Sequence, residues 1–148
     1  LNATTAGARE GGHAAAAWIG TSTEPTTCAG LTTTSFSGPG NDAESLRIIC
    51  RTKNRLTTAG GSRSRVRIRF EDVNGTASDG VVTNDTTNRF IVVCVQVKAR
   101  SITGLFSPVL NRMTLMARSR YRLEYSAAEL PFNIRSGGET FFDTSKAC

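Results

Sequence analysis

The chain has 148 residues, a formal net charge of +6 and a pI near 9.7. Hydrophobic residues make up 39% of it and charged residues 20%, a balance that excludes a globally disordered chain. The length predicts a single globular domain over residues 1–148, and no apolar run approaches the roughly 18 residues that a membrane-spanning helix needs.

Residues 1–18 predict a helix because they are rich in alanine, the strongest helix former. Small residues recur on one face of this helix and would permit close approach by another element: Ala3, Gly7, Gly11 and Ala14. The chain starts at Leu1, already within the predicted helix, and no signal peptide precedes it. We therefore expect a processed product or fragment, whose helix continues from an upstream segment.

A second helix follows a loop. Residues 19–40 are dominated by Thr, Ser, Gly and Pro, which predicts irregular structure. Asn41 or Asp42 is the expected N-cap of a helix that ends near Thr58, before the glycines at 60 and 61. Apolar residues recur along it at helical spacing, with three arginines on another face: Leu46, Ile49, Cys50 and Leu56 against Arg47, Arg51 and Arg55.

Three later segments alternate apolar and polar residues with a period of two, which is typical of half-buried antiparallel strands. They cover residues 64–70, 89–100 and 112–125, and a polar connection at 71–88 contains turn signals and a short candidate strand at 81–83. Residues 126–148 form a tail. Because helices precede strands, the predicted class is α+β: helix plus sheet over 41–125, with both helices on one face of an antiparallel sheet of three to four strands.

The other face of the predicted sheet is basic. Its members are Arg65, Arg67, Arg69, Lys98, Arg118, Arg120 and Arg122. Single-strand nucleic-acid modules stack bases on aromatic residues of such a face, but Phe70 and Tyr121 fall on the apolar side. The pattern thus favours a solvated or tail-covered surface over a nucleic-acid site, and leaves an anionic polymer, lipid headgroups or DNA open as partners.

Four cysteines lie 20 or more residues apart, at 28, 50, 94 and 148, and His13 is the only histidine. Zinc sites normally use close cysteine pairs, so two disulfides in an oxidising compartment are favoured over a metal site or four free thiols in a cytosolic protein. Three pairings are possible. We favour Cys28–Cys50 and Cys94–Cys148, because Cys50 and Cys94 are expected on opposite sides of the sheet.

The favoured second disulfide would draw the tail across the basic face. That would bring three acidic residues to the arginines: Glu129, Glu139 and Asp143. No hydrolase, nucleotide-binding or metalloprotease motif occurs, and His13 has no obvious carboxylate partner. We therefore expect no enzymatic activity, no cofactor and no bound metal.

Residues 8–15, with the sequence AREGGHAA, resemble the A-R-E-G-A-R-x-A-A stretch of TadE-like proteins, which are pseudopilins of the bacterial tight-adherence (Flp-type) pilus system. The later order of elements is also similar: a helix, a basic-apolar strand, an apolar strand, a proline-containing loop at 101–110 and a strand at 113–124 that ends in Arg122 and Glu124. The chain departs from the pattern at Gly12, where alanine is usual, and at His13, where arginine is usual.

The resemblance implies a pilin-like, non-enzymatic component of a type IV-like pilus or secretion system, acting in assembly, surface adhesion or both. It implies an exported, membrane-anchored protein whose missing N-terminal helix packs in the membrane or filament, with other pilins or pilus-assembly proteins as partners. Arg9 and Glu10 would make polar contacts where the helix leaves the bilayer, and the small face of Ala3, Gly7 and Gly11 would allow close helix packing.

Overall fold

The computed structural model describes residues 2–16, 25–28, 30–31, 36–37, 43–56, 61–78, 90–99, 107–110, 112–123, 136–146 and 148. The helices are α1 (Asn2–Ala16), α2 (Ala43–Arg55), the short 3-10 helix η3 (Gly61–Arg63) and α3 (Ser107–Leu110). The strands are β1 (Phe36–Ser37), β2 (Ser64–Glu71), β3 (Ala77–Ser78), β4 (Phe90–Lys98), β5 (Thr114–Arg122) and β6 (Gly137–Glu139). The predicted α+β class is confirmed.

Three long strands form the centre of an antiparallel sheet with the order β1-β6-β2-β4-β5. β2 pairs with β4 from Ser64 opposite Val97 to Glu71 opposite Phe90, and β4 pairs with β5 along its whole length. The short strands β6 and β1 extend the sheet beyond β2, and β3 pairs with the last residues of β2. The alternating segments of the sequence are thus the long strands.

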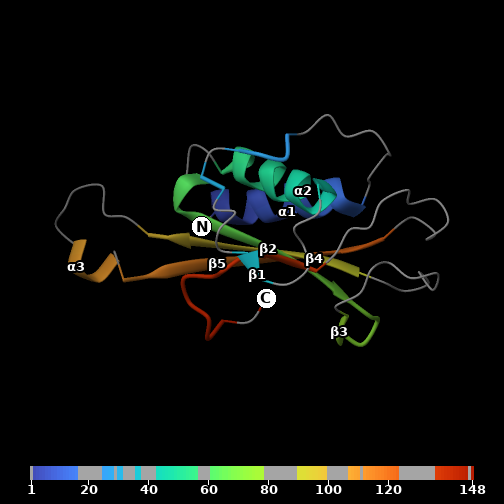
Figure 1. The fold of residues 1–148 in the computed structure, drawn as a ribbon. Helices are drawn as coiled ribbons and strands as arrows, with labels where there is room; N and C mark the ends of the chain where they lie inside the picture. The colour runs from blue at the N-terminus through green and yellow to red at the C-terminus, as the bar shows by residue number, and fades with distance from the viewer. Residues whose placement is uncertain are drawn as a thin grey trace.

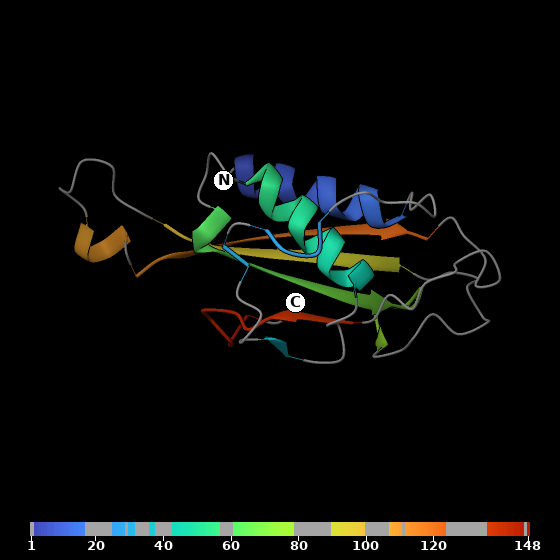
Figure 2. The same cartoon turned by 45° about the horizontal axis from the view of Figure 1, so that its top comes forward.

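Both helices cover one face of the sheet, and the C-terminal segment lies on the other (Figures 1 and 2). α1 packs over β4 and β5, while α2 lies beside it over β2. The core between these layers is built from the apolar residues of α2 and the three long strands: Ile48, Ile49, Leu56, Val66, Ile68, Phe70, Ile91, Val93, Val95, Val97, Ala117 and Leu123, with Ala8 of α1. The predicted apolar face of the sheet is the face that meets the helices.

Several short strands were not predicted. β1 lies in the segment interpreted as a loop, β6 lies in the tail, and β3 precedes the candidate strand at 81–83, which lies outside the described residues. Strands of two or three residues carry no periodicity of their own and form because a partner strand is in place. The turn at Asn74–Gly75 is confirmed: Gly75 has φ +82° and its N–H donates to the Asp72 carbonyl at 3.1 Å. The predicted caps Asn41 and Asp42 lie outside the described residues.

Glycines let α1 approach α2 and the sheet closely. A Cβ on Gly7 would stand 2.7 Å from a methyl carbon of Leu56, and one on Gly11 would stand 2.0 Å from Thr52 Oγ1. A Cβ on Gly12 would stand 2.4 Å from the Tyr121 ring, which explains glycine where alanine was expected. Gly7 and Gly11 are buried inside the domain. The close approach expected at this small face is therefore confirmed, and the element that approaches Gly7 and Gly11 is α2 of the same domain.

We expect Gly11→Ala to destabilise the domain by about 1–3 kcal/mol, the usual cost of overpacking. Thr52 cannot easily make room, because its hydroxyl is buried and donates to the Ile48 carbonyl at 2.8 Å. Helix propensity alone would make the same change stabilising by up to about 1 kcal/mol. Denaturant unfolding of both proteins measures the sign.

Thr52→Ala provides the matched background, because it removes the hydroxyl that the new methyl group would meet. In that background Gly11→Ala should cost much less than in the wild type. An equal cost in both backgrounds, or a stabilised Gly11→Ala single variant, would contradict this account of the helix contact.

Candidate functional site

The outward surface of α1 carries the polar residues that the sequence singled out. Arg9 and His13 are exposed, and the Glu10 carboxylate pairs with Arg51 of α2 at 2.9 Å. The His13 ring meets the Tyr121 ring edge to face, with centroids 6.4 Å apart. An open hollow of about 510 Å³ runs along this surface, lined by Thr5, Ala6, Arg9, Glu10, His13, Arg55 and Tyr121. Glu10 thus has a partner inside the domain, whereas Arg9 faces outward.

On the other side of the sheet, the strand register lines up basic residues in three cross-strand ranks. These are Glu71–Phe90–Arg122, Arg69–Val92–Arg120 and Arg67–Cys94–Arg118. We call this surface, together with Arg65 and Lys98, the arginine face. Its central members Val92, Cys94 and Gln96 are fully buried, although the strands on either side carry arginines. The centre of the arginine face is therefore covered, as the tail-covered interpretation expected, whereas its outer members Lys98, Arg118, Arg120 and Arg122 are exposed, as the solvated interpretation expected.

Aromatic rings do lie on the arginine face, so the expectation that it has none is wrong. Phe90 belongs to this face, and the Arg120 guanidinium lies 3.7 Å from its ring centroid. The tail adds two more rings: Phe141 lies under Arg67 at 5.6 Å, and Phe142 lies 4.6 Å from both Arg65 and Lys98. Phe90 shares this face because it has the same parity as Val92 and Cys94, whereas the sequence carries no signal that brings rings of the distant tail to it. These rings are occupied by cations of the same chain.

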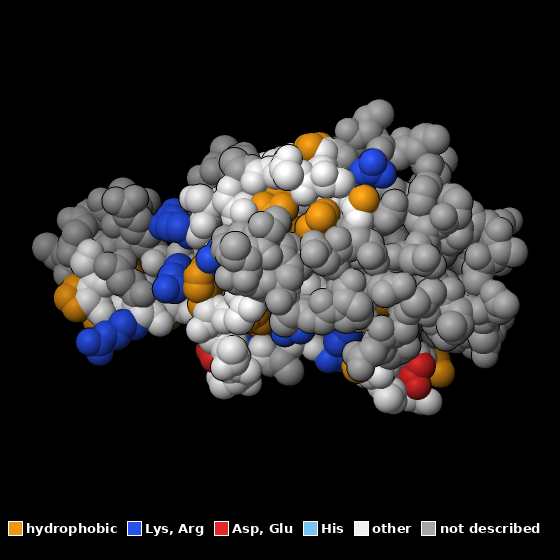
Figure 3. Space-filling view, in the orientation of Figure 1, with side chains coloured by type: hydrophobic (Ala, Val, Ile, Leu, Met, Phe, Trp, Pro, Cys, Tyr) orange, Lys and Arg blue, Asp and Glu red, His pale blue; other side chains and the backbone are white. Residues whose placement is uncertain are grey.

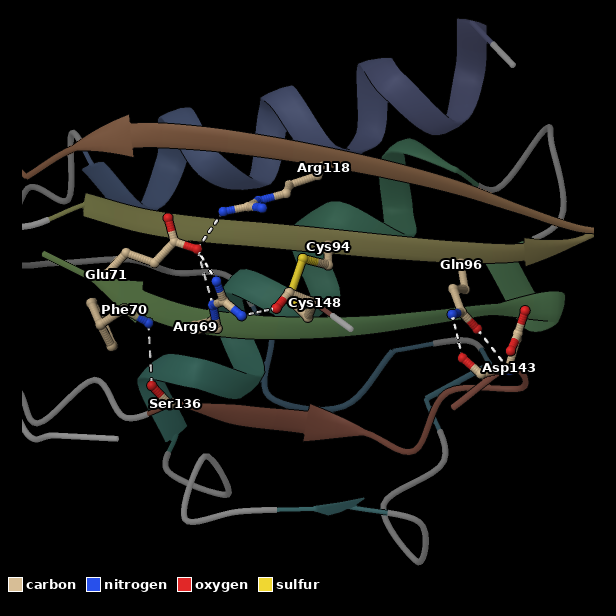
Figure 4. Close-up of a disulfide and its surroundings, with 9 residues drawn as sticks. All are labelled: Arg69, Phe70, Glu71, Cys94, Gln96, Arg118, Ser136, Asp143 and Cys148. Atoms are coloured by element: carbon tan, nitrogen blue, oxygen red, sulfur yellow. Dashed lines mark hydrogen bonds and ion pairs between the residues drawn. A yellow bond between two sulfur atoms is a disulfide. The ribbon is translucent and has the colours of Figure 1, made fainter. Parts of the chain in front are cut away.

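Glu71 neutralises much of the arginine face. Its carboxylate is 1% exposed and accepts hydrogen bonds from Arg69 and Arg118, while the Arg120 Nε lies 3.2 Å from its Oε2. Arg69 also donates to the Cys148 carbonyl (Figure 4). In the sequence, Glu71 stands at the start of the polar connection predicted at 71–88. Its register opposite Phe90, at the end of β2, is the signal that would have put it among the arginines.

Two disulfides anchor the outer segments. Cys28 is bonded to Cys50 of α2, and Cys94 of β4 is bonded to Cys148, with Cα atoms 5.4 and 5.7 Å apart. This is the pairing favoured from the sequence. Beside the second disulfide, the Gln96 side-chain amide exchanges two hydrogen bonds with the Asp143 backbone, at 2.9 and 3.1 Å (Figure 4). The tail is therefore held flat against β4 by covalent, polar and apolar contacts.

Of the three tail carboxylates, Asp143 lies over the arginine face, where a hydrogen bond from the Ser145 hydroxyl at 2.5 Å lowers its pKa. Glu129 lies outside the described residues. The expectation for Glu139 is confirmed only in part, because it reaches Arg65 of the arginine face but has its shortest contacts in the interior. Its Oε2 accepts from Lys53 Nζ of α2 at 2.8 Å and from the Val66 N–H at 3.0 Å, with both the Lys53 and Glu139 side chains fully buried. Because β6 pairs with the edge of β2, Glu139 meets α2 as well as Arg65, 3.6 Å away.

Burial lowers the pKa of Lys53, although the Glu139 carboxylate beside it favours the charged form. Lys53 Nζ also donates to the Ser64 carbonyl at 2.8 Å. The pair joins α2, β2 and β6 in the interior. No sequence signal marked Lys53 as buried, because lysine is almost never fully buried unless it is paired.

Among the described residues, no group of three or more His, Cys, Asp or Glu side chains could hold a metal ion. Within the same ranges, none of the helices combines the length and the hydropathy that a bilayer crossing requires. In comparisons with protein families, curated proteins and solved structures, the chain matches none of them. The surfaces described above are therefore interpreted from their own chemistry.

We expect Glu71→Gln to destabilise the domain by about 1–3 kcal/mol, because it removes the negative charge that the hydrogen bonds from Arg69 and Arg118 and the ion pair with Arg120 share. Glu10→Gln is the matched control, since the Glu10–Arg51 pair is well exposed and should be worth less than about 1 kcal/mol. Chemical denaturation of the two variants gives the comparison. Equal effects would show that the buried carboxylate does not organise the arginine face.

For the buried pair, we expect Lys53→Met and Glu139→Gln each to cost about 3–5 kcal/mol, because each leaves one buried polar partner uncompensated. The double variant should be much more stable than the sum of the two costs implies, since neither charge then remains. Additive costs in a denaturation cycle would contradict direct coupling between the two side chains.

The lowered pKa of Lys53 also sets a pH dependence. The unfolded chain, with a lysine pKa near 10.5, holds this proton at pH values where the folded chain has lost it. The stability of the wild type should therefore rise, relative to the double variant, between the folded pKa and pH 10.5. Unfolding curves at increasing alkaline pH would measure this, and a falling difference would contradict the direction.

Proposed function

We propose that this protein is a non-enzymatic pseudopilin or minor pilin of a tight-adherence, type IV-like pilus or secretion system, and that it acts outside the cytoplasm in assembly or surface adhesion. The observation that carries the proposal is α1. The segment with the A-R-E-G motif forms a 15-residue helix laid along an antiparallel sheet (Figure 2), with Arg9 facing outward. Other pilins or pilus-assembly proteins are the partners that this helix would meet.

Two further features support the proposal. The two disulfides, which use all four cysteines, suit an oxidising, extracytoplasmic compartment. The small residues of α1 bind it firmly to its own domain, so that forces applied along the helix would reach the sheet. In this proposal, assembly contacts use the outward surface of α1 around Arg9 rather than its glycine face.

We do not favour the alternative of an anionic-polymer or DNA module on the arginine face. Its arginines have partners within the chain: Glu71 holds Arg69, Arg118 and Arg120, and the tail rings pack against Arg65 and Arg67. A polyanion would have to compete with these contacts and with the tail bonded through Cys148.

The test is Arg9→Glu, introduced into the gene of the producing bacterium. We expect loss of surface pili by electron microscopy, and no change in the melting temperature of the purified domain, because Arg9 is exposed. Reversing the charge at an assembly contact opposes docking while leaving the fold intact.

Arg122→Glu is the matched control, since it reverses an equally charged, exposed residue on the arginine face. We expect it to leave piliation unchanged. Normal pili in Arg9→Glu would contradict the proposal, and lost pili in Arg122→Glu alone would move the contact to the arginine face.

A further inference from the structure

In the part of the chain between β4 and β5, the helix α3 (Ser107–Leu110) lies beyond the end of the sheet (Figures 1 and 2). Consecutive backbone hydrogen bonds shape the turn that follows it. The Arg112 N–H donates to the Val109 carbonyl at 3.2 Å, and the Met113 N–H donates to that of Leu110 at 3.0 Å. The Met113 carbonyl in turn accepts from the Ala99 N–H at 3.0 Å, which ties the turn to the end of β4. We call residues 107–110, 112 and 113 the tip.

The tip exposes large apolar side chains. Val109 is 64% exposed and Met113 is 46% exposed. Among the described residues, the other large hydrophobic side chain exposed to this degree is Val73, at 59%, in the turn between β2 and β3 at the opposite end of the sheet. A singly exposed valine such as Val73 is ordinary, but two apolar side chains on one projecting, hydrogen-bonded turn indicate a contact surface.

The charge of the same connection is entirely positive. Between residues 98 and 114 the sequence contains three basic residues and no acidic one, and Arg112 and Lys98 are both exposed. Figure 3 shows hydrophobic and Lys or Arg side chains together at the end of the molecule that carries α3. The sequence of the connection is also rich in large apolar residues. Asp143 of the tail lies in the same hollow as Lys98 and Arg112, but it pairs with Lys146 at 3.6 Å, so these surroundings keep a net positive charge. Apolar side chains at a projecting end, in surroundings of net positive charge, are the chemistry of an interfacial anchor.

We propose that the tip docks on an anionic lipid bilayer, with Val109 and Met113 entering the headgroup region and Arg112 binding lipid phosphates. A lipid surface fits better than a protein groove, because the apolar side chains sit on a projecting turn and the cations around them (Lys98, Arg112 and Lys146) outnumber the Asp143 carboxylate. α1 also begins toward the same end of the sheet (Figure 2). The bilayer contact of the tip does not depend on the proposed function. The proposed function adds only that α1 and the tip would face the same membrane.

The experiment is flotation of the disulfide-intact chain with vesicles of phosphatidylcholine, with and without phosphatidylglycerol. The whole chain carries a net charge of +6, which attracts it to any anionic vesicle. Substitutions that leave this charge unchanged therefore separate the contribution of the apolar tip residues from the general attraction. We expect the Val109→Asn, Met113→Gln double variant to bind anionic vesicles about tenfold more weakly than the wild type. Val73→Asn, which removes an equally exposed valine elsewhere, should bind as the wild type does. Arg112→Gln should weaken binding more than Arg55→Gln on α2.

Insertion into the bilayer is measured with the variant Val109→Trp, whose fluorescence brominated lipids should quench. Val73→Trp is the control, and because Trp18 contributes equally to both variants, the difference in quenching reports on positions 109 and 73. Equal binding by the double variant and the wild type, or equal quenching at positions 109 and 73, would overturn the proposal and point to a protein partner for the tip. This outcome is distinguishable from failure of the pilus assay, since it needs no pilus.

Discussion

The burial of β4 on both faces is the constraint on which the rest of this structure depends. Every residue from Ile91 to Val97 is buried, whereas an antiparallel strand usually leaves one face to water. Two layers are therefore needed. The helices supply the first, over Ile91 and its alternating neighbours, and the C-terminal tail supplies the second, over Val92, Cys94 and Gln96. The Cys94–Cys148 disulfide, the Phe141 contact and the paired Gln96 amide all serve that second layer.

The same arrangement explains how so many arginines can flank a buried strand. A single buried carboxylate, Glu71, is shared by arginines of β2 and β5, and rings from β4 and the tail pack against the guanidinium groups of Arg120, Arg65 and Arg67. Several positive charges of the chain thus form ion pairs and cation–π contacts that hold its layers together. Among the described residues, exposed cations are found at the ends of the sheet, on α1 and on α2. This distribution is why we place the candidate partner contacts at Arg9 and at the tip rather than on the arginine face.

The glycines of α1 couple the two helices to the sheet. Gly11 admits the Thr52 side chain and Gly12 admits the Tyr121 ring, so α1 is seated on both α2 and β5. Its other face stays open along the hollow next to Arg9 and His13. Because its small residues fix α1 to the domain and its polar side is exposed, a force applied at that polar side would be passed to the sheet. The glycine pattern thus holds one side of α1 inside the domain and leaves its polar side exposed, which is the side where we propose the assembly contacts.

Local pattern determined much of this protein. The alanine-rich helix, the amphipathic helix with Ile49 and Leu56, the three alternating strands and their α+β arrangement all follow from spacing, because side-chain periodicity reports which face is buried. The disulfide pairing followed from the same faces. Only the tertiary structure decided the roles of Glu71, Lys53 and Glu139, the short strands and the use of Gly7 and Gly11 inside the domain. These depend on contacts between residues far apart in the chain, such as Lys53 with Glu139, and side-chain charge or size at one position does not reveal its distant partner.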